Sequence, residues 1–277
     1  MKTIHTLVQD IYEVVKQDGW QERIQLDCRL GSGPQRRGTL RLSGMGPKCP
    51  RALWYSVHHS ELAESLPPYA QIKYAYGHIL ESLLIALAKE AGHTVTGEQD
   101  ELEVDGVPGH RDCVIDGCVA DVKSASSISF SKFKDGTIRE NDHFGYLDQL
   151  DGYLVGSAND PLVKVKDKGY LLAIDKTLGH ICLYEHHLRE HSIRERIRKY
   201  KEIVALPTPP SCTCGTQPDG KSGNIKLDVK ASYNPYKHQC FPHLRTFLYA
   251  SGPVYLSHVA RVPDVPEVIK NLTYKFN

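Results

Sequence analysis

The stretch from Val107 to Lys123 constrains the fold more than any other, because it predicts two short strands joined by a tight turn. The turn falls at Asp116-Gly117, a pair that favours the left-handed backbone of a two-residue hairpin loop. Side chains alternate between the two faces of a strand, so Asp121 and Lys123 on the second strand project from one face. The hairpin therefore presents a carboxylate and an ammonium group together.

A second carboxylate joins them. Asp112 interrupts the apolar run of the first strand at the point where the hairpin would lay it beside Asp121. Two carboxylates and a lysine buried together are costly to desolvate unless they pair with one another or bind a cation. A different interpretation is that Asp112 bonds turn amides, while Asp121 and Lys123 form an exposed ion pair on a strand edge. We favour the cation.

The chemistry of such a cluster suits phosphodiester hydrolysis, which needs a stabilised charged transition state and an activated water. A divalent metal ion held by carboxylates supplies both. Mg²⁺ prefers one or two protein carboxylates with several waters, which Asp112 and Asp121 can provide together with Glu81. Lys123 would lower the pKa of the attacking water or neutralise developing charge.

The order of the predicted elements indicates an α/β fold. An amphipathic helix over residues 3–17 stops at Gly19, and Pro50 begins a short helix with Cys49 at its cap. A strong helix follows over residues 69–91, with Glu81 in its middle, and a strand over 94–104 leads into the hairpin. After the hairpin come a helix over 143–156, strands within 163–184 and a basic helix over 187–204.

The length of 277 residues and an apolar content of 40% predict one catalytic domain with extensions. We expect an N-terminal helical segment over 1–68, a core over 69–206 and a C-terminal cysteine-containing segment over 207–277 that packs back on the N-terminal part. Eight cysteines are too few for a disulfide scaffold, and no signal sequence or membrane span is evident. These features predict a cytoplasmic protein without membrane partners.

A net charge of +1 excludes a generally basic protein, so any nucleic acid must meet a local patch. The basic helix over 187–204 is one such patch. The other is an arm bearing Arg36, Arg37 and Arg41, which could equally be a plain solvated loop.

Four sequence motifs resemble, in order, those of the PD-(D/E)XK nucleases. They are Gly77-His-Ile-Leu-Glu81, Pro108-Gly-His-Arg-Asp112, Asp121-Val-Lys123 and Gln149-Leu-Asp-Gly-Tyr153. The last motif is similar to that of the RecB-like exonuclease branch, which includes CRISPR-associated adaptation nucleases and AddB-type nuclease domains. The resemblance implies a restriction-endonuclease-like core, a central mixed sheet flanked by helices, with a helical N-terminal and a cysteine-bearing C-terminal extension.

The resemblance also implies roles for individual residues. Glu81, Asp112, Asp121 and the backbone carbonyl of Val122 would bind Mg²⁺ or Mn²⁺, and Lys123 would be the catalytic lysine. Gln149 and Tyr153 would line the active site and contact the DNA strand. Relatives often carry histidine in place of Glu81, so His78, one turn earlier, is either an accessory ligand or a hydrogen-bonded helix histidine.

In that branch, one cysteine before the core and three after it hold a [4Fe-4S] cluster. Cys49 and Cys240 resemble the first and last of these, whereas Ala231 and Asn234 stand where the two middle cysteines would be. Cys212 and Cys214 could replace them, and the four thiolates could equally bind Zn²⁺ or no metal. The remaining cysteines are interpreted as small packing residues: Cys28, Cys113, Cys118 and Cys182.

The expected function is that of a Mg²⁺- or Mn²⁺-dependent DNA exonuclease, encoded by a phage and acting in the host cytoplasm in DNA recombination, replication or degradation. The alternatives are an endonuclease of the same fold and a non-catalytic DNA-binding module. Single-stranded DNA or duplex ends would be held through phosphates, and Tyr146 and Tyr153 would stack on a frayed end. Protein partners are not indicated. The other acidic residues are predicted at turns or on the surface (Asp105, Asp116, Asp148) or at caps or turns (Asp135, Asp142).

Overall fold

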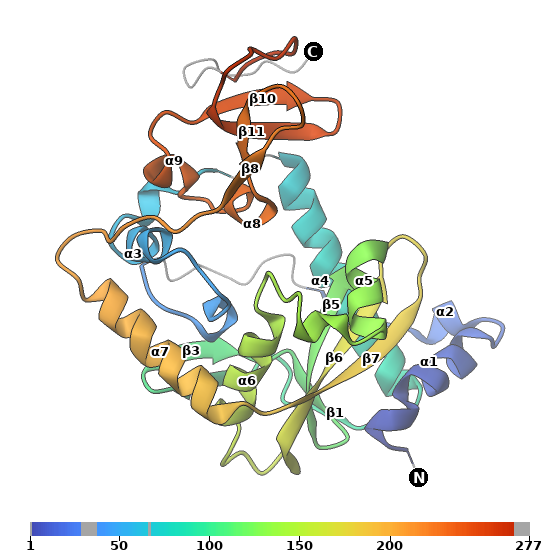
Figure 1. Cartoon of the computed structure of the whole chain (residues 1–277). Helices are drawn as coiled ribbons and strands as arrows, with labels where there is room; N and C mark the ends of the chain where they lie inside the picture. The colour runs from blue at the N-terminus through green and yellow to red at the C-terminus, as the bar shows by residue number, and fades with distance from the viewer. Residues whose placement is uncertain (1, 29–37, 66–67, 269–277) are drawn as a thin grey trace. The chain divides into compact units, whose positions relative to one another are not determined.

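The chain contains a five-stranded mixed sheet in the order β1-β4-β5-β6-β7 (Figure 1). This computed structural model describes residues 2–28, 38–65 and 68–268. The strands are β1 (Val95–Thr96), β4 (Cys113–Ile115), β5 (Cys118–Ala125), β6 (Val165–Asp175) and β7 (Ile181–His187). β5 and β6 are parallel and the other pairs are antiparallel. The predicted mixed sheet is confirmed, with β5 at its centre.

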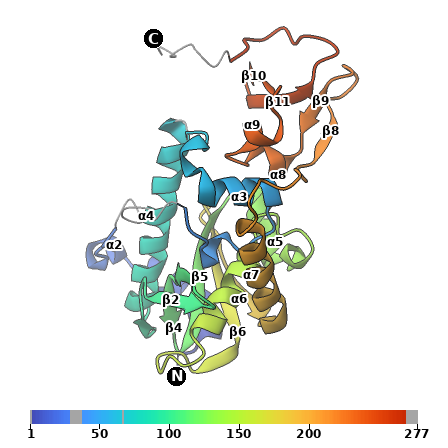
Figure 2. The same ribbon diagram turned by 90° about the vertical axis from the view of Figure 1, so that its left-hand side faces the viewer.

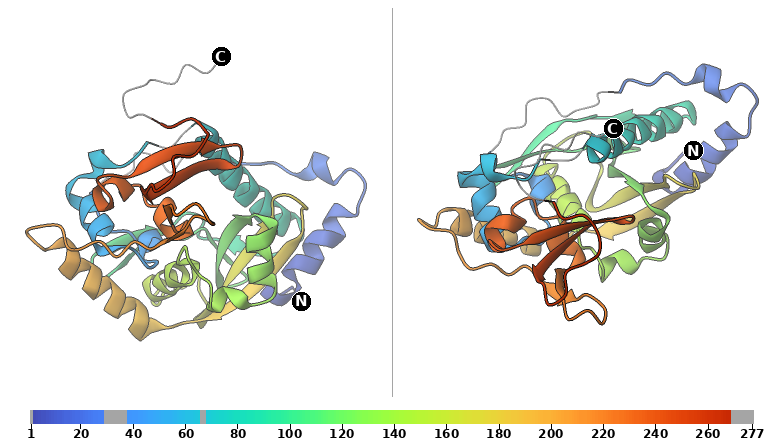
Figure 3. Two further views of the ribbon diagram at one scale, coloured as in Figure 1. Left: turned by 45° about the horizontal axis from the view of Figure 1, so that its top comes forward. Right: turned by 90° about the horizontal axis from the view of Figure 1, so that it is seen from above.

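Helices cover both faces of the sheet. On one face lie α1 (Leu7–Val15), preceded by the 3-10 turn η1 (Ile4–Thr6), and α4 (Pro68–Glu90), which run beside each other (Figure 3). Their apolar side chains form a core cluster with Ala120 and Val122 of β5. α5 (Ser127–Lys134) and α6 (Tyr146–Gly156) contact the sheet as well, and Figure 2 shows α4 and α6 on opposite sides of it. Alternation along β5 therefore turns Asp121 and Lys123 away from the α1–α4 core.

The predicted hairpin is confirmed between β4 and β5. Its turn residues Asp116 and Gly117 have φ values of 51° and 81°, the left-handed conformation that an Asp-Gly loop accommodates. The register pairs Cys113 with Ala120, so Asp112, just before β4, stands next to Asp121.

The prediction of one strand over residues 94–104 was wrong, because the chain turns between β1 and β2 (Glu101–Val104). Gly97 and Gln99 both have positive φ there, at 58° and 57°. β2 pairs with β3 (Val107–His110) in a separate two-stranded sheet, so the stretch from Val107 to Lys123 contributes three strands instead of two. The turn is shaped around a buried side chain: Arg111 is fully enclosed and its Nε donates to the carbonyl of Gly97.

The helix predictions are confirmed with shifted ends. α4 ends at Glu90 before Gly92, α3 (Pro50–His58) begins at Pro50 with Cys49 as N-cap, and α7 spans Glu190–Val204. α5 was missed inside a polar stretch, and the two predicted strands within 163–174 form the single strand β6. Among the short helical elements are α2 (Trp20–Arg23), η2 (Leu42–Gly44), η3 (Ser60–Leu62) and η4 (Thr137–Arg139).

The described residues fall into two compact units. Unit 1 contains residues 2–28, 40–47 and 68–199, and therefore the mixed sheet. Unit 2 contains residues 38–39, 48–65 and 200–268. These boundaries differ from the three predicted segments, whose status as domains stays a prediction. None of the helices in the described part of the chain is long and apolar enough to cross a membrane.

Unit 2 is built on an antiparallel sheet in the order β10-β11-β9-β8. Its strands are β8 (Thr216–Pro218), β9 (Ile225–Leu227), β10 (Arg245–Tyr249) and β11 (Gly252–His258), with the short helices α8 (Val229–Ser232) and α9 (Lys237–Cys240) between β9 and β10. One small cluster buries Leu227, Ala231 and Leu244, with Cys214 packed against it.

Candidate active site

Asp121 and Lys123 form an ion pair on the central strand of the sheet. Nζ of Lys123 lies 2.6 Å from Oδ2 of Asp121, whose side chain has no exposure to solvent. Apart from this ion pair, Oδ2 has no hydrogen-bond partner. The alternative of an exposed pair at a strand edge is therefore wrong, since β5 has a neighbouring strand on either side.

Asp112 reaches the same place from the start of β4. Its Oδ2 accepts a hydrogen bond of 2.7 Å from the backbone N–H of Val122, a strand amide and not a turn amide. The charge of Asp112 adds to the effect of burial in raising the pKa of Asp121. Two neighbouring buried carboxyl groups repel one another when both are ionised, so this pair favours either protonation or a bound cation.

Gln149 and Tyr153 on α6 complete the cluster. Gln149 donates from Nε2 to Oδ1 of Asp121 at 3.3 Å and to the hydroxyl of Tyr153 at 2.7 Å. Its Oε1 accepts from Nζ of Lys123 at 3.4 Å. One amide therefore bonds the aspartate, the lysine and the tyrosine, which holds the ion pair in a fixed orientation.

Glu81 lies on α4, and its carboxylate is engaged by a residue outside the Asp112–Asp121 pair. Its Oε1 accepts a hydrogen bond of 2.8 Å from Nε2 of Gln99. Glu81 nevertheless feels the charges of Asp121 and Lys123. His78, one turn earlier on α4, is half-buried, and its role as an accessory ligand stays a prediction, as does that of the Val122 carbonyl.

Burial and neighbouring charges shift the pKa values of the whole cluster. Burial raises the pKa of Asp121 to about 7 and that of Asp112 to about 6, with Lys123 opposing both shifts. Burial also raises the pKa of Glu81, and Asp121 adds to the shift. Burial alone would lower the pKa of Lys123, but the two aspartates outweigh it and the pKa is raised. A divalent cation would relieve this repulsion, so the donor set fits one.

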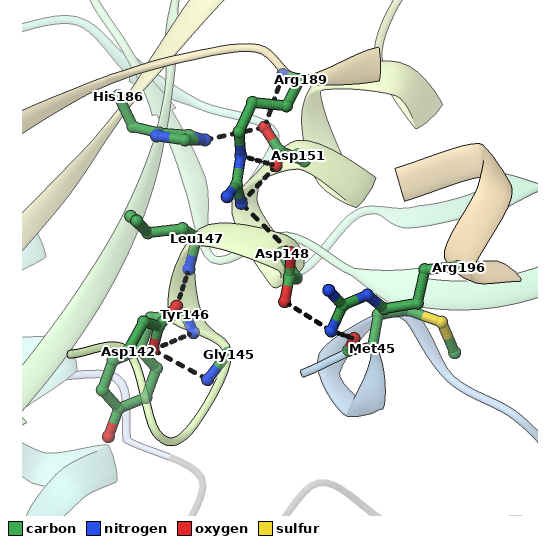
Figure 4. A network of polar contacts seen from close by, with 10 residues as sticks. All are labelled: Met45, Asp142, Gly145, Tyr146, Leu147, Asp148, Asp151, His186, Arg189 and Arg196. Carbon is green, nitrogen blue, oxygen red and sulfur yellow. Dashed lines mark hydrogen bonds and ion pairs between the residues drawn. The ribbon is translucent and has the colours of Figure 1, made fainter. Parts of the chain in front are cut away.

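An ionic network with two buried carboxylates, those of Asp148 and Asp151, anchors α6 (Figure 4). Asp151, which has no solvent exposure, accepts from Nε of Arg189 at 2.8 Å and contacts Nε2 of His186 at 2.7 Å. Asp148 pairs with Arg189 at 3.1 Å and with Arg196 at 2.9 Å. The prediction that Asp148 is a turn or surface residue was wrong, because it lies on the inner face of the helix.

The remaining acidic predictions hold. The carboxylate of Asp142 accepts from the backbone N–H groups of Gly145, Tyr146 and Leu147 and so caps the start of α6 (Figure 4). Asp135 is the C-cap of α5. Asp105 and Asp116 lie at turns with positive φ.

Tyr153 cannot stack on a DNA base as predicted, since its ring is 2% exposed and its hydroxyl is engaged by Gln149. Tyr146 remains accessible in part. Its ring lies 5.1 Å from Nζ of Lys123 and 5.7 Å from the ring of Phe144, which is 52% exposed. Sequence reasoning missed Phe144, because a single aromatic residue in a polar stretch has no distinctive pattern.

The predicted phosphate-binding patches are less available than their composition indicates. Arg189, Arg194 and Arg196 all form ion pairs with acidic side chains of unit 1, Arg194 with both Asp105 and Glu190. Arg36 and Arg37 of the predicted arm lie outside the described residues.

The four cysteines predicted as a site converge within unit 2. Sγ of Cys49 lies 3.9 Å from that of Cys212 and 3.8 Å from that of Cys240, and Sγ of Cys214 lies 3.7 Å from that of Cys240. Among the described residues they form the one group of three or more metal-ligating side chains gathered within 4.8 Å. The other cysteines lie apart from this group; Cys113 and Cys118 are buried, and burial raises the pKa of Cys118 and Cys182 to about 11.

Comparison with known proteins gives distant similarity only. No family model and no curated protein matches the sequence. Among solved structures, SSO0001 is 18% identical with a TM-score of 0.41, over 87% of this chain and 96% of that one. An alkaline exonuclease from Laribacter hongkongensis is 14% identical with a TM-score of 0.43, over 61% of this chain and 88% of that one. A phage related exonuclease from Haemophilus somnus 129PT has the same identity and TM-score, over 61% and 92%. At these values the likeness assigns no residue and no activity to this chain.

Proposed function

We propose that unit 1 is a metal-dependent nuclease that cleaves DNA from an end. The observation that carries this proposal is the ion pair of Lys123 with the buried Asp121, held against Asp112 and Gln149. Buried carboxylates of raised pKa next to a fixed ammonium group are typical of a catalytic site. The order of the four sequence motifs favours the same conclusion.

Asp112 and Asp121 would hold Mg²⁺ or Mn²⁺, with Glu81 joining them after release from Gln99 and the Val122 carbonyl as a further donor. When bound, such an ion supplies stabilisation of phosphate charge and a lowered pKa of water. Oδ2 of Asp121, which contacts only Lys123, is the oxygen best suited to bind the metal ion.

Lys123 would neutralise charge on the phosphate group undergoing displacement. Its ammonium group is already ionised, because the pKa is raised, so it acts as a fixed positive charge and not as a base. Gln149 positions Lys123 through Oε1, and the hydroxyl of Tyr153 positions Gln149 in turn. Tyr153 thus acts through Gln149 and does not itself contact the reacting atoms.

The aromatic surface beside Lys123 favours single-stranded DNA as substrate. The half-buried ring of Tyr146 lies next to the ammonium group of Lys123, and the exposed ring of Phe144 lies beside that of Tyr146. Ring faces stack on bases without regard to sequence. Tyr74 of α4 is 61% exposed and helps to raise the pKa of Tyr146, after the larger effect of burial, so it belongs to the same surface.

The finer parts of the proposal come from the motif resemblance alone. They are the preference for ends over internal sites, the choice between Mg²⁺ and Mn²⁺, phage origin, the role in DNA recombination, replication or degradation, and a place in the host cytoplasm. An endonuclease and a non-catalytic DNA-binding module are the alternatives that the experiment below must separate.

Digestion of end-labelled linear DNA, single- and double-stranded, tests the proposal when run beside circular single-stranded DNA. We expect linear strands to shorten only with a divalent ion, and circles to stay whole. Lys123→Ala should lower the rate about 100-fold or more, the usual cost of removing one charge-stabilising group. The matched control is Lys134→Ala, an exposed lysine at the end of α5.

Each alternative gives a distinct result. Cleaved circles would identify an endonuclease. DNA binding without cleavage under any divalent ion would favour the non-catalytic module. Full activity of Lys123→Ala would show that the assigned site is wrong.

A further inference from the structure

The four-cysteine group of unit 2 carries an inference that does not depend on nuclease activity. We propose that Cys49, Cys212, Cys214 and Cys240 bind one Zn²⁺ ion as a closed structural site, in place of the [4Fe-4S] cluster that the resemblance implies. The spacing of the sulfur atoms is the observation that separates the two.

A mononuclear site and a cluster require different distances between the sulfur atoms. Four thiolates at ~2.3 Å from one zinc ion in a tetrahedron stand about 3.8 Å from one another. In a [4Fe-4S] cluster each thiolate binds a different iron at a corner of the cube, which puts the sulfur atoms about 6 Å apart. The separations in the structure are 3.9 Å for Cys49–Cys212, 3.8 Å for Cys49–Cys240 and 3.7 Å for Cys214–Cys240, and all four sulfur atoms lie within 4.8 Å of one another. The cube does not fit between them.

The groups around the sulfur atoms donate hydrogen bonds, as thiolates require. The backbone N–H of Thr213 donates to Sγ of Cys49 at 3.4 Å, and that of Cys214 donates to Sγ of Cys212 at 3.3 Å. Nδ2 of Asn234 lies 3.4 Å from Sγ of Cys214 and 3.7 Å from Sγ of Cys240. Such donors stabilise the negative charge of a tetrathiolate zinc site and orient its ligands.

Asn234 explains why the sequence departs from the resemblance at this position. It stands where a middle cysteine of the cluster would be, yet here its amide donates to two of the sulfur atoms. The C-x-C pair of Cys212 and Cys214 supplies the two missing ligands. A hydrogen-bond donor to the ligands thus stands where the resemblance would place a ligand.

The location of the site indicates a structural role. Cys49 caps α3, Cys240 ends α9, and the C-x-C pair lies in the segment before β8, so the site joins three pieces of unit 2. Four protein ligands leave no open position for water or substrate. The small Leu227, Ala231 and Leu244 cluster next to Cys214 gains from such a cross-link, since a metal site contributes directly to folding.

Metal and sulfide analysis of the full-length protein tests the proposal. The protein is produced in medium containing both iron and zinc and purified without oxygen, so that a cluster would survive. We expect about one zinc ion per chain, no acid-labile sulfide and no colour. Four irons with four sulfides, iron without sulfide, or folded protein without metal would each overturn it.

Cobalt replacement reports on geometry without any use of activity. Protein produced with Co²⁺ should show the intense visible bands of tetrahedral cobalt bound by thiolates, and weak octahedral bands would contradict the site. Cys212→Ser and Cys240→Ser should lose these bands, whereas Cys182→Ser, outside the group, should keep them.

Two further measurements cover the case in which the ligand variants do not fold. In the wild-type protein, titration with an organomercurial should release zinc in proportion to the modification of four thiols. Asn234→Ala keeps all four ligands and should lower zinc affinity about 10- to 100-fold, as loss of a ligand-supporting hydrogen bond does. Unchanged affinity in Asn234→Ala, or zinc release unconnected with thiol modification, would overturn the proposal.

Discussion

Lys123 and Asp121 form an ion pair of 2.6 Å inside the sheet, with the carboxylate fully removed from solvent. The neutral variant Lys123→Met keeps the length of the side chain but leaves Asp121 without its counter-charge. We expect the single-turnover rate of DNA cleavage to fall about 100- to 1,000-fold, while DNA affinity measured by anisotropy stays within about threefold. Lys134→Met is the control. Equal losses of rate and affinity would mean that Lys123 only binds DNA.

Replacing Tyr153 by phenylalanine separates positioning from packing. The change removes only the hydroxyl that accepts a hydrogen bond from Gln149, so the buried ring still fills its place. We expect about a 10-fold lower rate, because Gln149 no longer holds Lys123 and Asp121 in one orientation. Tyr12→Phe is the matched control, since the Tyr12 hydroxyl accepts from the backbone of Ile181 away from the site. It should lose about 1 kcal/mol of stability without loss of activity.

The two raised aspartate pKa values predict how stability depends on pH without divalent ions. Folded Asp112 and Asp121 hold protons up to pH values of about 6 and about 7, whereas unfolded aspartates release them near 3.8. The folded state therefore binds more protons within this window, and the free energy of unfolding should fall as pH rises from about 4 to 7.

Urea denaturation in EDTA at several pH values measures this slope, which Asp112→Asn should reduce. Because protons and the cation compete, Mg²⁺ should raise the melting temperature more at pH 8 than at pH 5.5. A stabilisation by Mg²⁺ that is equal at both values would contradict a carboxylate site of raised pKa.

The network behind α6 should matter for stability more than for chemistry. Asp151→Asn removes the buried charge that pairs with Arg189, whose side chain is 43% exposed, and that bonds His186. We expect the free energy of unfolding to fall by about 1–3 kcal/mol, because the charged hydrogen bonds of a buried acceptor are lost. Asp167→Asn, on the exposed side of β6, should change it little. A loss of activity in Asp151→Asn at full stability would place this residue in the reaction instead.

Phe144→Ala tests the proposed stacking surface. Loss of one base–aromatic contact should weaken binding of single-stranded DNA by about 1–3 kcal/mol and leave duplex binding nearly unchanged. Leu178→Ala, a similarly exposed apolar residue at the turn after β6, is the control. Equal weakening for both DNA forms would argue against stacking on a frayed end.

The sequence predicts the geometry of this cluster where the signal is local. The Asp116-Gly117 turn sets the register of β4 and β5, and period-two alternation then places Asp121 and Lys123 on one face. These rules depend only on neighbouring residues. The prediction that Gln149 and Tyr153 share a face of α6 follows from helical spacing in the same way.

Predictions failed where burial depends on distant partners. The sequence around Asp148 predicts a surface residue, because its partners Arg189 and Arg196 lie about 40 positions or more further along the chain. Tyr153 was predicted to be accessible, because no residue pattern within its own helix indicates that it is buried. The spacing of the four cysteine sulfur atoms is likewise invisible in the chain, and it is the property that distinguishes one metal ion from a cluster.

The cysteine site also sets an order of events during synthesis. Cys49 precedes Cys212 by 163 positions, and all strands of the mixed sheet are translated between them. When Cys49 and α3 leave the ribosome, the other three cysteines have not yet been synthesised. Closing so long a loop also has an entropic cost, which no contact within the loop offsets until the sheet has formed. The mixed sheet can therefore assemble first, and the four-cysteine group can close only after Cys240 has been synthesised.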